Sequence, residues 1–387
     1  MRSFSSILRI APFFSTSSGW KCFQLGLFVL PSSAFFSALF LLPALVIGSL
    51  HREKPFWMDY WNWPFIFASI LMVVGSFNAY TGWLAFIGLG NWLPFFWSFW
   101  GFQPYLNSPF RRRRCAVLFI AGTVPVLITG FGQLWFGWQG PWQSFGGLII
   151  WFIAPGGEPF GRLSGLFDYA NIAGAWLALV WPFFLAALLQ KDLGRKSRIM
   201  VLFLAIGIVA AMVLTDSRNA WGALMLAIPL VFGPSSWKWL LPVLAFFLLP
   251  ILLAITPGVP FGLQEFSRKL VPENIWSRLN DIRYLDQRPL ATTRLSQWRI
   301  ALDLIFERPW LGWGAAAFSV LYPLRTGQWH GHAHNLPLEI GVSHGLFTSL
   351  MIVGTALILL IVSLKLGVLH SKSTLAIFDR AWWTSAF

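Results

Sequence analysis

The chain has 387 residues, of which 57% are hydrophobic and 11% are charged, and its formal net charge is +14. A soluble globular domain carries about 25% charged residues, so this composition excludes an ordinary soluble protein. No basic patch with interleaved aromatic residues stands outside the hydrophobic segments, so the positive charge indicates cytoplasmic loops and anionic lipid rather than nucleic acid. We therefore predict an all-α, polytopic helical bundle in a lipid bilayer.

The hydrophobic segments are long enough for about ten transmembrane helices of roughly 20 residues each. Basic clusters in short loops mark the cytoplasmic side, and those at 111–114 and 191–198 are the strongest. With Arg2 and Arg9 in the cytoplasm, residues 22–50 cross twice around a tight turn at 31–33. The alternative is one long span with the N-terminus outside. The predicted spans are two within 22–50, then 62–77, 83–105, 115–136, 169–190, 198–214, 219–235, 239–256 and 335–366.

Two arginines lie in short segments that this topology places outside, against the usual charge bias. Arg162 lies in 161–165, after a Trp-rich stretch that we expect to be interfacial or re-entrant. Arg218 follows Thr215, Asp216 and Ser217, which are good helix-capping residues, so it would sit in a helical first turn that favours an anion. The alternative for both is a snorkelling arginine paired with a headgroup phosphate.

The one long polar segment, 257–333, is predicted to be periplasmic, because long loops escape the charge rule. Within it, 293–307 has the pattern of an amphipathic helix whose apolar face is Leu295, Trp298, Leu302, Ile305 and Phe306. Arg294 and Arg299 project elsewhere, toward a substrate or toward lipid headgroups.

Three alternating histidines, His330, His332 and His334, stand where this loop returns to the membrane. They could bind a metal ion on one face of an extended strand, or be structural, or include a general base. For the last interpretation, Asn335 could cap the following helix and Glu339 could orient an imidazole.

A general base beside several arginines favours a phosphorylated substrate. Arginine binds phosphate bidentately and can stabilise a departing pyrophosphate without a metal ion, while the base takes a proton from an acceptor hydroxyl. The segments then divide into N-terminal transmembrane helices (1–256), a periplasmic catalytic loop (257–334) and a C-terminal transmembrane segment (335–387). A further apolar segment begins at 381–383, so we expect either that the chain ending at Phe387 is truncated or that this segment lies at the membrane interface.

From 161 to 354 the chain resembles the O-antigen ligase and O-antigen polymerase superfamily. The most specific feature is His334-Asn335, a nine-residue gap, and then Gly345-Leu346-Phe347-Thr348. The turn at 215–218 is similar to the family's Thr-x-Ser-Arg turn. The segments 294–298 and 309–314 resemble those before the family's histidine, and 161–165 with Asn171 fits its earlier outer motif.

The resemblance implies a fold like that of C-type glycosyltransferases and a metal- and cofactor-independent enzyme of the bacterial inner membrane. The donor would be a glycan on undecaprenyl pyrophosphate, and the acceptor a lipid-anchored sugar, a growing glycan or a protein hydroxyl. His334 would be the base and Arg218 the second catalytic group. The implied substrate-binding residues are Arg294, Arg162, Arg299, His332 and Asn335.

Two alternatives remain at the level of the sequence. One is a transporter of a small anion such as bicarbonate, although ionisable residues are nearly absent from the span centres. The other is a non-catalytic partner in glycan assembly. The sequence does not separate a ligase from a polymerase.

Overall fold

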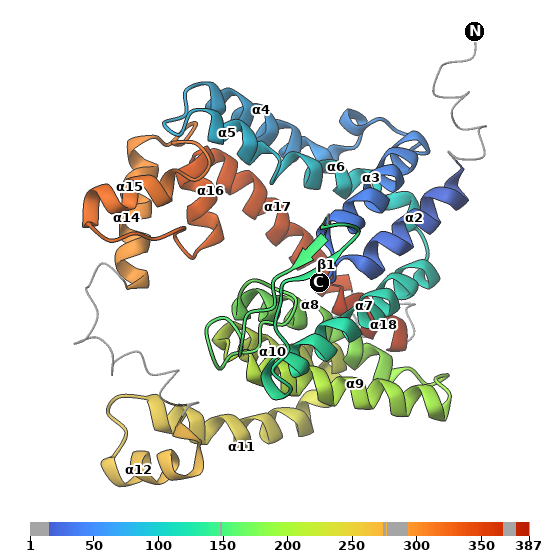
Figure 1. Cartoon of the computed structure of the whole chain (residues 1–387), viewed down its shortest axis with the longest axis vertical. Coiled ribbons are helices and arrows are strands. Elements are labelled where there is room, and N and C mark those ends of the chain that lie inside the picture. Colours follow the sequence, from blue (N-terminus) through green and yellow to red (C-terminus); the bar gives the residue numbers. More distant parts are fainter. Residues whose placement is uncertain (1–14, 148, 274–275, 277–292, 367–376, 387) are drawn as a thin grey trace. The chain divides into compact units, whose positions relative to one another are not determined.

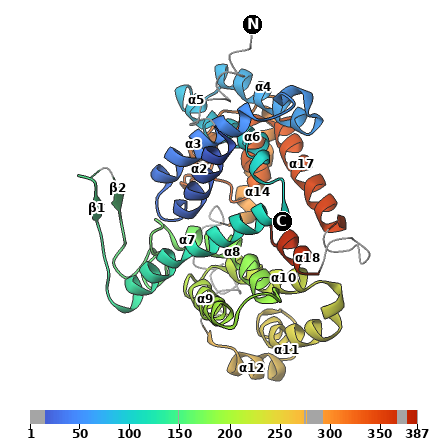
Figure 2. The same ribbon diagram turned by 90° about the vertical axis from the view of Figure 1, so that its right-hand side faces the viewer.

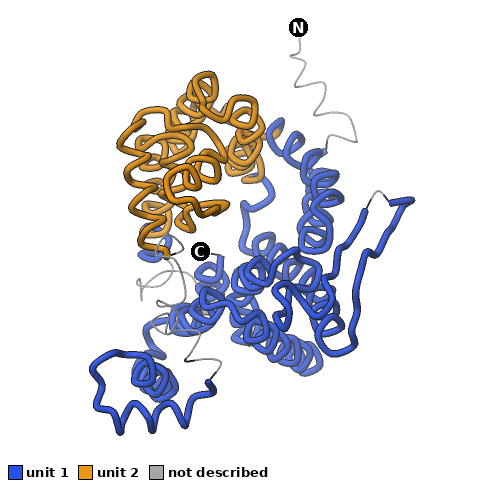
Figure 3. Tube along the Cα trace, turned by 60° about the vertical axis from the view of Figure 1, so that its left-hand side comes forward, with its two compact units in different colours: residues 1–50, 104–280, 362–387 blue, residues 51–103, 281–361 orange. Residues whose placement is uncertain are grey.

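The structure is a computed structural model that describes residues 15–147, 149–273, 276, 293–366 and 377–386. The N-terminal residues 1–14, on which the predicted orientation partly rests, lie outside this description. The chain forms two compact units, one of residues 1–50, 104–280 and 362–387 and the other of residues 51–103 and 281–361 (Figure 3). The division of the chain at 256 and 334 remains a prediction about topology.

The first unit is a helical bundle with one small β-hairpin. Its apolar core comes mainly from α7 to α10 and α18, and includes Leu177, Phe184 and Ile208, which are completely buried. Its helices are α2 (Thr16–Val29), α3 (Ala34–Leu50), α7 (Pro109–Trp135), α8 (Ala170–Leu189), α9 (Arg195–Leu214), α10 (Arg218–Phe232), η5 (Pro234–Ser236), α11 (Trp237–Ile255), α12 (Phe261–Leu270) and α18 (Ile377–Ser385) (Figure 1).

The predicted tight turn at 31–33 is confirmed, because α2 and α3 pack as a helical hairpin around it. The Ser37 hydroxyl donates a buried hydrogen bond to the Gly26 carbonyl across the pair (3.0 Å). A Cβ on Gly26 would lie 2.6 Å from Leu41, so glycine is what allows this close approach. Small residues and hydrogen bonds at helix interfaces are the usual means of packing in lipid.

The Trp-rich segment after α7 does not span. It forms the antiparallel strands β1 (Trp142–Ser144) and β2 (Ile149–Trp151), with Trp142 opposite Trp151 (Figure 2). The Trp151 indole donates to the Ser32 carbonyl (2.6 Å), which attaches the hairpin to the turn between α2 and α3.

The second unit combines helices from two distant parts of the chain. Buried Phe65, Met72 and Phe96 form one apolar cluster in it, and Ala301, Leu304 and Phe318 belong to another. Its elements are η2 (Phe56–Met58), η3 (Tyr60–Asn62), α4 (Trp63–Phe77), α5 (Trp83–Leu89), α6 (Leu93–Gly101), α14 (Arg294–Glu307), α15 (Ala317–Thr326), α16 (Leu336–His344) and α17 (Leu346–Leu364), which continues past Ile361, while η4 (Gln103–Tyr105) lies at the boundary.

All ten predicted spans fall on helices, and the all-α polytopic membrane fold is confirmed. Six helices of the described chain have the length and composition to cross a membrane, and Ala34–Leu50 and Arg218–Phe232 are shorter apolar helices. Two predicted spans are not continuous. The segment 83–105 is interrupted at 90–92 between α5 and α6, and 335–366 breaks at Gly345 between α16 and α17.

The predicted helix at 293–307 is confirmed as α14, but its predicted apolar face is not the face that packs, and only Ile305 of that face is buried. Leu295 is 75% exposed and Phe306 70%, whereas Ala301 and Leu304 are completely buried. The packing face is set by small residues. A Cβ on Gly341 of α16 would lie 2.6 Å from the Ile305 side chain, so Gly341 and Ala301 allow α14 and α16 to approach.

Candidate active site

The turn that carries Arg218 connects α9 to α10. Asp216 has a left-handed backbone with φ of 51°, which is uncommon outside glycine and marks a constrained turn. Ser217 occupies the N-cap position and Arg218 begins α10, as predicted, but no capping bond reaches the Ser217 side chain. The Thr215 hydroxyl instead donates back to the Met212 carbonyl (2.7 Å), closing the last turn of α9.

Arg162 holds this turn from the preceding loop. Its Nε donates to the Thr215 carbonyl (2.8 Å), and an Nη2 hydrogen bond reaches the Asp216 carbonyl (3.2 Å). The same nitrogen donates to Asn171 Oδ1 at the start of α8 (2.7 Å). The structure therefore brings together both outer motifs predicted from the sequence. These contacts attach the Arg162 loop to the turn that carries Arg218.

A residue that sequence reasoning missed supports the Arg162 loop. Gln133, 1% exposed near the end of α7, accepts hydrogen bonds from the backbone N–H groups of Ser164 (3.1 Å) and Gly165 (2.8 Å). Its amide nitrogen donates to the Ala154 carbonyl (2.8 Å). The signal was a lone glutamine in an apolar helix, because a buried amide is costly unless it is hydrogen-bonded.

The three histidines form a cluster of rings in the second unit. The His332 and His334 ring centroids are 4.1 Å apart, and His330 lies 6.4 Å from His334. His330 also makes an edge contact with Tyr322 of α15 (5.5 Å), whose side chain is buried. The histidine rings therefore contact one another. They do not lie on one face of an extended strand, as the metal-binding interpretation required. Within the described residues, no three His, Cys, Asp or Glu side chains gather to hold a metal ion.

The backbone around His334 is fixed on both sides. Ala333 is completely buried and donates its N–H to Glu339 Oε2 (2.9 Å). Asn335 caps α16 as predicted, its Oδ1 accepting from the Leu338 N–H (3.3 Å). Between these anchors His334 is exposed and has a φ of 53°. Left-handed conformations outside glycine persist where surrounding structure holds them, and often occur at functional sites.

Arg294 stands at the start of α14, and its charge reaches the histidine cluster. The helix is capped by Thr293, whose hydroxyl accepts from the Ser296 N–H (3.4 Å). Partial burial, the Arg294 guanidinium and the His330 imidazole together lower the pKa of His332, which favours the neutral ring. Arg299 is also exposed. It follows Arg294 by five residues, so it lies about 140° around the helix from Arg294. The geometry thus links Arg294 to the histidine cluster, but it does not link Arg299 to that cluster.

The glycine of the His334 signature has a structural role. Gly345 ends α16 with a φ of 89°, and a Cβ there would lie 2.4 Å from the Trp310 carbonyl oxygen. The Leu346 N–H donates to the Pro309 carbonyl (2.7 Å) and the Trp313 N–H to the Val342 carbonyl (2.8 Å). The segment 309–314 therefore crosses the break between α16 and α17, so two motifs that are distant in sequence form one junction.

Comparison with known protein families gives one match, to the family model described as O-antigen ligase, over residues 201–353. Residues 201–353 are therefore similar to the O-antigen ligase family. The matched segment extends from α9 into α17 and contains Arg218, Arg294, His334 and Gly345. A search of curated proteins finds no match to the chain.

The O-antigen ligase match supports glycan transfer of the ligase or polymerase type, with lipid-linked glycan substrates and a multi-pass protein in a bilayer. It begins after Arg162 and Asn171, so the assignment of that outer motif still rests on its sequence and on its contacts with the matched turn.

Proposed function

We propose that this O-antigen ligase family protein transfers a glycan from undecaprenyl pyrophosphate to a hydroxyl acceptor on the periplasmic face of the inner membrane. The observation that carries the proposal is one family match that contains both the turn of Arg218 and the left-handed backbone of His334. The acceptor is a lipid-anchored sugar, as in a ligase, or a growing glycan, as in a polymerase.

In this reaction His334 is the general base. Its neutral imidazole takes the proton of the acceptor hydroxyl, and the oxygen attacks the anomeric carbon of the donor. The bond from that carbon to the pyrophosphate oxygen breaks, the pyrophosphate leaves with the electron pair, and the configuration is inverted.

The leaving group requires positive charge as its bond breaks. Arg218 and Arg294 are assigned to the pyrophosphate, since guanidinium groups bind phosphate bidentately and stay charged at all relevant pH values. No metal ion is needed for this step. Arg162 supports Arg218 through the turn, and Asn335 positions His334 through the helix cap.

The test measures glycan transfer in proteoliposomes with a lipid-linked glycan donor. We expect His334→Ala and Arg218→Ala each to reduce transfer by at least about 100-fold, as expected for loss of a base or of charge stabilisation. Membrane insertion should be unchanged. Arg325→Ala is the control, because Arg325 is an exposed basic residue of the unit that contains His334, is paired with Glu307 (2.6 Å), and should retain transfer.

Wild-type transfer rates in both variants would contradict the assignment. A flux of bicarbonate in proteoliposomes that lack the glycan donor would favour the transporter alternative instead. Loss of all attached surface glycan in a deletion strain would indicate a ligase, and single repeat units remaining on the anchor would indicate a polymerase.

A further inference from the structure

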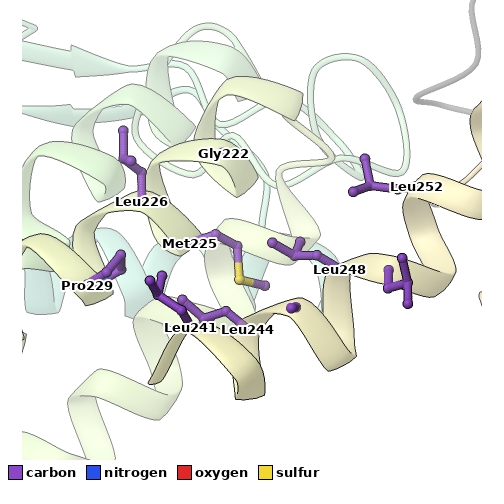
Figure 4. Close-up of a pocket in the computed structure, with 10 residues that line it drawn as sticks. Gly222, Met225, Leu226, Pro229, Leu241, Leu244, Leu248 and Leu252 are labelled. Atoms are coloured by element: carbon purple, nitrogen blue, oxygen red, sulfur yellow. The ribbon is translucent and has the colours of Figure 1, made fainter. Parts of the chain in front are cut away.

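An apolar groove of about 580 Å³ runs between α10 and α11 in the first unit. All of its lining residues are apolar, and both helices contribute side chains to it (Figure 4). The α11 wall extends from Leu241 to Leu252, which is about 17 Å along a helix. Only Leu240 and Ala254 of α11 are buried, so most of this helix is left to face lipid.

The α10 wall leads directly to Arg218. It consists of Gly222, Met225, Leu226 and Pro229, which follow Arg218 by four, seven, eight and eleven residues. This spacing places all five on one face of the helix. Arg218 begins the helix about 6 Å, or one turn, above Gly222. One helix face therefore carries a cation at its end and an apolar trough along its length.

We propose that this groove holds the isoprenoid chain of the donor, at the end of the chain next to the pyrophosphate. The inference rests on the proposed function, since it takes Arg218 as a pyrophosphate ligand. A polyprenyl pyrophosphate has the same layout as this helix face, with an anionic head joined directly to a long apolar chain. Binding the first isoprene units in the groove fixes the direction from which the pyrophosphate reaches Arg218.

Binding in the groove is expected to position the donor more than to raise its affinity for the protein. The chain is already in hydrocarbon when the donor is in the bilayer, so entering the groove removes little apolar surface from water. Packing between two helices instead restricts the chain and the head group attached to it. Holding reactants in register is a large source of rate enhancement, and small displacements are costly.

Gly222 provides the sharpest test, because it leaves the groove open beside Arg218. A Cβ added there meets nothing within 4 Å, so the first atom of a larger side chain enters open space. Replacing glycine in a helix also favours the helix by up to about 1 kcal/mol, so loss of folding is not expected. Gly354 of α17 is the matched control, as it too has nothing within 4 Å and lies outside the groove.

The experiment uses the full chain in proteoliposomes and a polyprenyl pyrophosphate whose isoprenoid chain carries a photoreactive diazirine. We expect the probe to label 222–229 and 241–252 in the wild type. Gly222→Leu should reduce this labelling severalfold and raise KM for a long-chain glycan donor, with no change for a donor whose pyrophosphate carries a methyl group in place of the isoprenoid chain. Gly354→Leu should change neither.

Three results would overturn the groove assignment. They are wild-type labelling in Gly222→Leu, equal effects on the donors with and without the isoprenoid chain, or equal labelling by a photoreactive phospholipid, which would mark a general lipid groove. Each can occur while His334→Ala still abolishes transfer, so the groove can fail while the function stands. Conversely, labelled groove residues in a protein that transfers no glycan would contradict the proposed function alone.

Discussion

Two backbone anchors determine where the imidazole of His334 lies. The Ala333 N–H is held by Glu339 and the Asn335 side chain caps α16, so the residue between them is kept in a left-handed conformation. Glu339 therefore acts on the backbone of the histidine loop, and not on an imidazole as the sequence suggested. Its own N–H donates to the Asn335 carbonyl (2.9 Å), which joins the two anchors in one turn.

Glu339→Ala should lower transfer by up to about 100-fold through kcat, because the buried Ala333 N–H loses its acceptor and His334 moves. Glu339→Gln should restore most of the rate, since an amide oxygen can accept the same bond. The measurement is KM and kcat for both variants in proteoliposomes. A Glu339→Gln protein as inactive as Glu339→Ala would show that the carboxylate itself takes part in the chemistry.

At this scale the sequence predicted which residue types matter but not how they are held. The cap at Asn335 was predictable, because it is a local pattern at a helix start. The Arg162 contacts with the Thr215 turn were not, since they join residues 53 positions apart. The roles of Gln133 and Glu339 depend likewise on which backbone groups the fold brings within reach.

At the scale of elements, the junction of α16 and α17 sets the frame for the histidine loop. The Ser349 hydroxyl donates to the Pro337 carbonyl across the break (2.7 Å). Gly312 is crowded like Gly345, since a Cβ on Gly312 would lie 2.6 Å from the backbone nitrogen of His344. Helix ranges such as α14 follow from periodicity and caps, so they could be predicted. Which face is buried could not, because Ala301 and Gly341 give no strong apolar signal.

Gly345→Ala should destabilise the protein by about 2 kcal/mol or more, from the positive φ and the contact with the Trp310 carbonyl together. Transfer should fall as well, because the junction positions the histidine loop. Thermal unfolding in detergent measures the first effect. Gly354→Ala, in open space on α17, should be neutral or slightly stabilising. Equal melting temperatures for the two variants would contradict the role of Gly345 at the junction.

At the scale of the whole chain, segments predicted to share a side of the membrane contact one another within each unit. In the first unit, Arg113 of one predicted cytoplasmic cluster pairs with Asp379, and Arg380 donates to the Phe232 carbonyl next to another loop that is predicted to be cytoplasmic. In the second, the Tyr80 N–H donates to the Trp313 carbonyl, and both lie in segments predicted outside. The segment 381–383 lies in the helix α18. It packs Ala381 and Trp382 into the core of the first unit.

The cytoplasmic assignment of these contacting segments can be tested by cysteine labelling. Cys22 and Cys115 are first replaced by serine, and single cysteines are then placed at two exposed positions, Asp168 and Lys191, at opposite ends of α8. Because the basic loop at 191–198 is predicted to be cytoplasmic, a membrane-impermeant maleimide should label Asp168→Cys in intact spheroplasts. It should label Lys191→Cys after permeabilisation only. Labelling of Lys191→Cys before permeabilisation would invert the topology and move Arg218 to the cytoplasmic face, away from a periplasmic acceptor.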